Sequence, residues 1–236
     1  MAIVLLQIPE FIFGVDSVLR GQGADPEVIR SRRPRLYAIA EKALDEGKEL
    51  LRPAVLYRQL DVKETRHDQL ILEDQFKVSG EIVSHHLRSA QSIIAIICTI
   101  GKELEEHAAR ISDSDLSYGL ALDGVGSAGV ESLANAVCGY FEKENSKDGF
   151  RTSMPLSPGM LGWPVEKGQP LIFEILQAGQ IGVALNPQYM MSPRKSVSIL
   201  IGVGKELGNS GDPCDFCVMN AVCRYKDQYA QRKQNE

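Results

Sequence analysis

Hydrophobic and polar positions along the chain fall into two patterns, one typical of helices and one typical of buried strands. Apolar residues recur at helical spacing over 26–47, where Asp25 can cap the helix, Pro26 fits its first turn and Gly47 can close it. The run at 92–100 is apolar and rich in β-branched residues, which predicts a buried strand. The longest helical pattern spans 115–144.

Shorter patterns of the same kinds occupy most of the remaining chain. They predict helices at 81–90, 102–111 and 170–178, and strands at 70–72, 76–78, 181–185 and 196–203. The first 24 residues mix apolar positions with Gly14, Gly21 and Gly23, which favours a strand and turns. Because helices and strands mix without a regular βαβ rhythm, the pattern predicts an α+β fold.

Three glycines, Gly124, Gly126 and Gly129, interrupt the long helical pattern. Inside a helix each costs about 1 kcal/mol relative to alanine, so a compensating contact is expected. A residue without a side chain lets another backbone or a flat ligand approach closely, and we favour tight helix–helix packing. The spacing also matches the bare dinucleotide-binding pattern, but it lies inside a helix rather than after a strand, so a nucleotide site is rejected.

Residues 152–168 are rich in proline and glycine and predict a loop of fixed shape. Each proline locks φ and each glycine permits a positive φ, so the segment can adopt few conformations. The loop contains Trp163, the only tryptophan of the chain. Loops carried on a rigid scaffold often hold functional residues, so this segment is a candidate functional loop.

Composition narrows the class of protein. The chain has 236 residues and a formal net charge of −5, and its pI is near 5.5. It lacks the long basic run that nucleic-acid binding requires, so no nucleic-acid partner is expected. The N-terminus lacks the basic start of a signal peptide, and the longest apolar run is too short to span a membrane. We therefore expect a cytoplasmic protein without a membrane partner, with a main domain at 1–205 and a C-terminal segment at 206–236.

Three of the five cysteines, Cys214, Cys217 and Cys223, form a C-x2-C-x5-C motif. A C-x2-C turn directs two thiolates at one metal, and the third cysteine can add a further ligand, which suits zinc or an iron–sulfur cluster. A redox dithiol is the alternative, although it does not require the third cysteine. The fourth ligand is open among Cys98, Cys138, Asp215 and a histidine. Cys98 and Cys138 lie in apolar segments that fit a core position better.

An ordered set of short motifs runs through the second half of the chain. It consists of Ser157-Pro158-Gly159, Trp163-Pro164, Gln169, Phe173, Ile181-Gly182-Val183-x-Leu185 and Met191-x-Pro193-x-Lys195-Ser196-Val197-Ser198. With the upstream Thr99-Ile100-Gly101 and the helix around 122–131, the set resembles the activation domain of cobalamin-dependent methionine synthase, and more closely its stand-alone relatives. The resemblance covers roughly residues 15–205. Those relatives often carry a C-terminal cysteine cluster as well.

The resemblance implies a fold, a partner and a reaction. The family fold is an α+β domain with a curved antiparallel sheet, and it docks over the corrin ring of a cobalamin-binding protein or domain. The family binds S-adenosylmethionine and, with one electron, rescues inactive cob(II)alamin by reductive methylation. A ferredoxin or a flavodoxin is the kind of protein that would supply that electron. In this reaction the protein contributes positioning and charge placement.

The resemblance also implies a set of cofactor-binding residues. They are Glu131, Arg151, Ser157, Pro158, Gly159, Met160, Trp163 and Lys195. The chain departs from the family at two positions: Pro155 stands where the family has an arginine suited to the carboxylate of S-adenosylmethionine, and Met160 stands where it has a tyrosine. Arg151 is the nearby candidate that could replace the missing guanidinium.

Two further functions are compatible with these residues. The first is a non-catalytic or electron-delivering partner of a corrinoid protein, which carries the C-terminal metal or iron–sulfur site and does not bind S-adenosylmethionine. The second is a metal-binding protein unrelated to corrinoids, because a fold resemblance does not by itself determine function.

Overall fold

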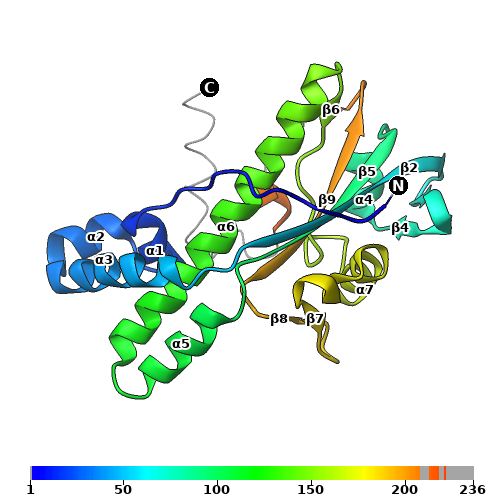
Figure 1. The fold of residues 1–236 in the computed structure, drawn as a ribbon. Helices are drawn as coiled ribbons and strands as arrows, with labels where there is room; N and C mark the ends of the chain where they lie inside the picture. Colours follow the sequence, from blue (N-terminus) through cyan, green and yellow to red (C-terminus); the bar gives the residue numbers. More distant parts are fainter. Residues whose placement is uncertain (1, 208–212, 218–220, 222–236) are drawn as a thin grey trace.

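The computed structural model describes residues 2–207, 213–217 and 221. At its centre lies an antiparallel sheet with the strand order β4-β3-β2-β5-β9-β6 (Figure 1). β5 pairs along one edge of β2, and β1 and β3 pair with different parts of β2's other edge. The strands of this sheet are β1 (Val4–Leu5), β2 (Ala54–Thr65), β3 (Gln69–Leu72), β4 (Lys77–Ser79), β5 (Ser92–Thr99), β6 (Arg151–Thr152) and β9 (Ser196–Gly204). A separate two-stranded hairpin joins β7 (Ala184–Leu185) to β8 (Met191–Ser192).

Helices cover both faces of the sheet. They are α1 (Val15–Gly21), α2 (Pro26–Arg32), α3 (Pro34–Glu49), α4 (Glu81–Leu87), α5 (Glu103–Ser112), α6 (Leu116–Lys147) and α7 (Val165–Leu176). The long α6 crosses one face, with α1, α3 and α5 packed beside it (Figure 1). The other face is covered by α4, α7 and the loop at 153–164. No helix in the described part of the chain is long and apolar enough to cross a membrane.

β5 shows why the sheet needs a cover on each side. All eight of its residues are buried, as the apolar run predicts. Ile94 and Ile96 point into the core beneath α6, whereas Ile93 and Ile97 point into the core beneath α7. This alternation follows from the period of two in an extended strand, which sends successive side chains to opposite faces.

The helix expected at 26–47 differs from the structure in two respects. The helix expected at 26–47 is divided into α2 and α3, because Pro34 begins a new helix there. The cap at its start is confirmed, since Asp25 Oδ1 accepts a hydrogen bond from the Glu27 backbone N–H at 2.9 Å. Gly47 does not close α3, which continues to Glu49.

Three other expectations also need correction. The N-terminal stretch contains the helix α1 as well as the strand β1. The strand expected at 181–185 is reduced to β7, because residues 178–181 form a short 3₁₀ helix. The helix α7 begins at Val165, earlier than the expected 170, and carries Pro170 inside it.

Gly124 of α6 serves helix packing. A Cβ atom on Gly124 would lie 2.7 Å from the carbonyl oxygen of Val18, and one on Gly21 would lie 2.6 Å from the carbonyl oxygen of Gly124. The backbones of α1 and α6 therefore touch where both residues lack side chains. The preference for helix–helix packing over a flat ligand at Gly124 is confirmed at this contact.

This contact predicts that a glycine-to-alanine substitution in α6 has opposite effects on protein stability at Gly124 and at Gly139. Gly124→Ala should destabilise the protein by about 1–3 kcal/mol, because the new methyl group overpacks a backbone contact. Gly139→Ala is the matched control: Gly139 is exposed, nothing lies within 4 Å of its Cβ position, and the change should stabilise the protein by about 0.5–1 kcal/mol. Urea denaturation measures both. Changes of the same sign would contradict the packing account.

Candidate functional site

The candidate functional loop begins as an extension of the sheet. After β6, the Ser153 backbone N–H donates to the Gly202 carbonyl of β9 at 2.8 Å, and Ser153 Oγ accepts from the Gly202 N–H at 2.9 Å. Leu156 and Leu200 then exchange two backbone hydrogen bonds, of 2.9 and 2.8 Å. The chain thus stays attached to β9 up to the start of the Ser157-Pro158-Gly159 turn.

Residues 157–163 form a closed turn that depends on two glycines. The Gly159 N–H donates to the Trp163 carbonyl at 2.8 Å, and the Trp163 N–H donates to the Met160 carbonyl at 3.0 Å. Gly159 and Gly162 have φ values of +101° and +79°, which residues with a side chain rarely adopt. The loop expected at 152–168 is thus found over 153–164, whereas Thr152 belongs to β6 and residues 165–168 belong to α7.

Trp163 anchors this turn in the second core. Its side chain is 1% exposed, and it packs where Gly168 of α7 leaves room: a Cβ atom on Gly168 would lie 2.8 Å from Trp163 Cε2. The Gly162 carbonyl also accepts the N–H of Glu81 at the start of α4, at 3.2 Å. A cofactor contact by Trp163 stays a prediction, whereas its role in fastening the loop to α4 and α7 follows from these contacts.

Met160 is in contact with its own turn and with the C-terminal segment. Its sulfur accepts the Ser157 backbone N–H at 3.4 Å. Its backbone forms an antiparallel bridge with Cys217, and the Leu161 N–H donates to the Phe216 carbonyl at 2.9 Å. The structure therefore brings the candidate loop and the cysteine motif together. Sequence analysis missed this contact, because neither segment carries a pattern that signals pairing.

Lys195 and Glu131 are associated with α6 rather than with the turn. Lys195 Nζ donates to Asp123 Oδ2 at 2.9 Å and to Ser127 Oγ at 2.8 Å, and its stem lies over Gly126. The side chain is only 15% exposed, so its charge is largely balanced by Asp123. Glu131 lies about two helical turns beyond Asp123 in α6 and is half-buried.

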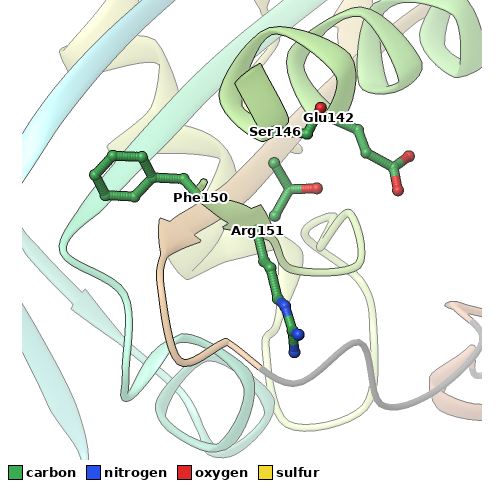
Figure 2. Close-up of a pocket in the computed structure, with 5 residues that line it drawn as sticks. Glu142, Ser146, Phe150 and Arg151 are labelled. Atoms are coloured by element: carbon green, nitrogen blue, oxygen red, sulfur yellow. The ribbon is translucent and has the colours of Figure 1, made fainter. Parts of the chain in front are cut away.

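Arg151 lies beside a cavity of about 300 Å³ at the C-terminal end of α6. The cavity is lined by Glu142, Ser146, Phe150, Arg151 and Thr152 (Figure 2). Figure 2 shows the Arg151 guanidinium directed away from the Glu142 carboxylate. Arg151 is exposed, and no ion pair of the described residues involves it. It is thus a cation available to an anionic group.

The cysteines divide between the two faces of the sheet. Cys98 is fully buried in the first core with Cys138 packed against that core, and burial raises the pKa of the Cys98 thiol well above its usual value, with Cys138 adding to the effect. Cys217 is half-buried beside Met160. Cys223 and the side chain of Cys214 lie outside the described residues. Among the described residues, no group of three or more His, Cys, Asp or Glu side chains could hold a metal ion.

His86 of α4 lies at the same edge of the second core as the C-terminal segment. Its ring contacts the Phe216 ring edge-on, with 4.7 Å between centroids. Burial lowers the pKa of His86, and the neighbouring His85 lowers it further, which favours the neutral imidazole. From the sequence, His85 and His86 are adjacent on one helix and cannot both face one site, so each is expected to be structural or solvated.

Comparison with known proteins supports the fold. No family model matches the chain, and no curated protein matches it. Among solved structures, the MetH reactivation domain bound to AdoHcy matches with a TM-score of 0.61 and 15% sequence identity, over 99% of this chain and 86% of that one. At this identity the likeness concerns the fold. The predicted α+β fold, with a curved antiparallel sheet and packed helices, is thereby confirmed.

The anchoring role of Trp163 predicts a large stability loss on truncation. Trp163→Ala should cost about 3–5 kcal/mol, because a fully buried aromatic side chain leaves a cavity. Leu161→Ala, on the same turn but 53% exposed, is the matched control and should change stability by less than about 0.5 kcal/mol. Guanidinium denaturation followed by far-UV circular dichroism measures both. Similar losses for the two variants would show that Trp163 does not anchor the loop.

Proposed function

We propose that the chain services a corrinoid protein by reductive methylation of its cobalamin, with S-adenosylmethionine as the methyl donor. The observation that carries this proposal is the match over 99% of the chain to a reactivation domain solved with AdoHcy. AdoHcy is what remains of S-adenosylmethionine after the methyl group has left. The partner in this proposal is a cobalamin-binding protein or domain, which presents its corrin ring to the chain.

The proposed reductive methylation consumes one electron and one methyl group for each cob(II)alamin. A low-potential donor of the ferredoxin or flavodoxin class reduces cob(II)alamin to cob(I)alamin. The Co(I) electron pair attacks the methyl carbon of S-adenosylmethionine, the carbon–sulfur bond breaks, and methylcob(III)alamin and AdoHcy result. The protein's own contribution is to hold the methyl group in line with the cobalt and to exclude competing geometries.

Arg151 is the residue that we propose for the carboxylate of S-adenosylmethionine. It replaces the guanidinium that is absent at Pro155, and its exposed side chain borders the 300 Å³ cavity. An arginine fork can pair with a carboxylate through two parallel hydrogen bonds. Glu131 is the proposed carboxylate for the sulfonium or the amine. The turn at Ser157-Pro158-Gly159 would contribute carbonyl oxygens, because its N–H groups are used within the turn. Lys195 donates a hydrogen bond to Asp123 and so holds this carboxylate in place on α6, and we propose that it contributes to the site in this indirect way.

Two features of the loop support a second function without S-adenosylmethionine. Pro155 has no polar side chain to offer, and Met160 has its sulfur on the Ser157 N–H and its backbone bridged to Cys217. A loop closed in this way disfavours S-adenosylmethionine binding, which leaves a non-catalytic or electron-delivering corrinoid-protein partner as the alternative. Both functions use the same docking fold.

We also propose a metal site at Cys214, Cys217 and Cys223, which holds zinc or an iron–sulfur cluster. The support comes from the C-x2-C-x5-C spacing, and from the position of Cys217 against the candidate loop. A zinc ion there would fasten the C-terminal segment to the fold. An iron–sulfur cluster would also supply the low-potential electron. A cytoplasmic location fits either metal and stays a prediction.

Anaerobic spectroscopy tests the proposed reaction. A cobalamin-binding module holding cob(II)alamin is mixed with the chain, a low-potential reductant and S-adenosylmethionine. We expect the cob(II)alamin absorption to be replaced by that of methylcob(III)alamin only when all components are present. A complex that forms without methylation, whatever the donor concentration, would reject methyl transfer in favour of the second function.

Arg151→Gln tests the carboxylate assignment. Loss of a charge-assisted bidentate pair should weaken S-adenosylmethionine binding about tenfold or more, because such bonds contribute about 1.5–3 kcal/mol. Arg35→Gln removes an exposed arginine of α3 and serves as the control with unchanged binding. Calorimetric titration compares both variants with the wild type. Equal affinities for the wild type and Arg151→Gln would remove Arg151 from the site.

A further inference from the structure

The cavity at the C-terminal end of α6 carries two opposite charges that are not paired with each other. Arg151 and Glu142 both line this cavity, whose volume is about 300 Å³. Both residues are exposed, and no ion pair of the described residues involves either of them. Figure 2 shows the Arg151 guanidinium directed away from the Glu142 carboxylate. The cavity therefore offers one place for an anion and a separate place for a cation.

The backbone fixes the elements that carry these two charges. Glu142 and Ser146 are four residues apart on α6, which places them on the same face of the helix. The chain then turns directly from α6 into β6, because the Phe150 N–H donates to the Asn145 carbonyl at 3.1 Å. β6 begins at Arg151 and pairs with β9. The carboxylate and the guanidinium thus come from two elements that a tight turn and the sheet hold together.

The end of α6 favours a cation on the Glu142 side of the cavity. Ser146 lies in the last turn of α6, and a helix C-terminus has the negative end of the helix dipole and carbonyl groups without helical partners. The Glu142 carboxylate adds a full negative charge. The nearby Lys147 is already paired with Glu144, at 2.6 Å. An ammonium group therefore suits this side of the cavity, and a carboxylate suits the Arg151 guanidinium.

We propose that the cavity binds the α-amino-acid end of S-adenosylmethionine, with the ammonium at Glu142 and the carboxylate at Arg151. This inference rests on the methyl-donor function proposed above and adds Glu142 as a ligand-binding residue. An α-amino acid carries both charges on one carbon atom, so two unpaired opposite charges in one cavity match it. The amine is thereby assigned to Glu142 instead of Glu131. Both glutamates lie on one face of α6, about three turns apart, and the rest of the ligand would extend along this face toward Glu131.

Three ligands separate the contribution of the amino-acid end from that of the rest of the molecule. AdoHcy has the same amino-acid end as S-adenosylmethionine but lacks the positive sulfonium, and 5′-methylthioadenosine lacks the amino-acid end. Calorimetric titration with each ligand compares the wild type with Glu142→Gln. We expect the variant to bind S-adenosylmethionine and AdoHcy about tenfold or more weakly, because a charge-assisted hydrogen bond is lost. Its affinity for 5′-methylthioadenosine should equal that of the wild type.

Glu41→Gln is the matched control for the loss of one negative charge. Glu41 is an exposed glutamate of α3 and does not line the cavity. The control should leave the affinity for all three ligands unchanged. Circular dichroism verifies that both variants are folded.

The outcomes separate this inference from the proposed function. Unchanged AdoHcy binding by Glu142→Gln, or weaker binding of S-adenosylmethionine alone, would overturn the assignment of Glu142 to the ammonium, while the methylation assay would still decide the proposed function. L-Methionine that binds as tightly as AdoHcy would instead assign the cavity to free amino acids, against the proposal. The expected binding without methylation would support the cavity assignment and reject methyl transfer. A wild type that binds neither S-adenosylmethionine nor AdoHcy would overturn both.

Discussion

Every residue of β5 is buried, and this double burial is the constraint from which the rest of the structure follows. A strand buried on both sides needs an apolar layer over each face. Gly124 of α6 lets α1 approach closely on one face. On the other face the layer is completed by Trp163, which belongs to the candidate loop. The loop is therefore anchored in the core through Trp163, and the packing of this side chain helps to fix the shape of the turn.

This arrangement leaves the candidate loop with one side packed on the core and the other side, at the turn of residues 157–163, facing outward. Gly159 and Gly162 set the path of the turn through their positive φ values. The buried Trp163 side chain attaches the turn to the second core. The C-terminal segment then adds a backbone bridge at Met160. A docking partner would thus meet a surface that is ordered before binding, which lowers the entropic cost of association. Arg151 contributes an exposed positive charge at the cavity by the C-terminal end of α6.

Much of the fold could be predicted from the sequence, because long periodic patterns determine element type. The buried strand at 92–99, the Asp25 cap and the long helix at 116–147 all follow from local signals. β2 was missed because polar residues such as Arg58 and Asp61 break its apolar pattern, and α1 was missed because Gly21 has the appearance of a turn residue. The bridge between Met160 and Cys217 depends on a tertiary contact, which local patterns do not encode.

The central claim is that the chain docks on a protein-bound corrinoid, whichever chemistry follows. Sedimentation velocity of the chain mixed with a cobalamin-binding module, loaded or empty, tests this claim most directly. The account predicts a one-to-one complex with the cobalamin-loaded module and little or none with the empty module, because the proposed contact is with the corrin ring. Equal binding to both modules, or no complex with either, would contradict it.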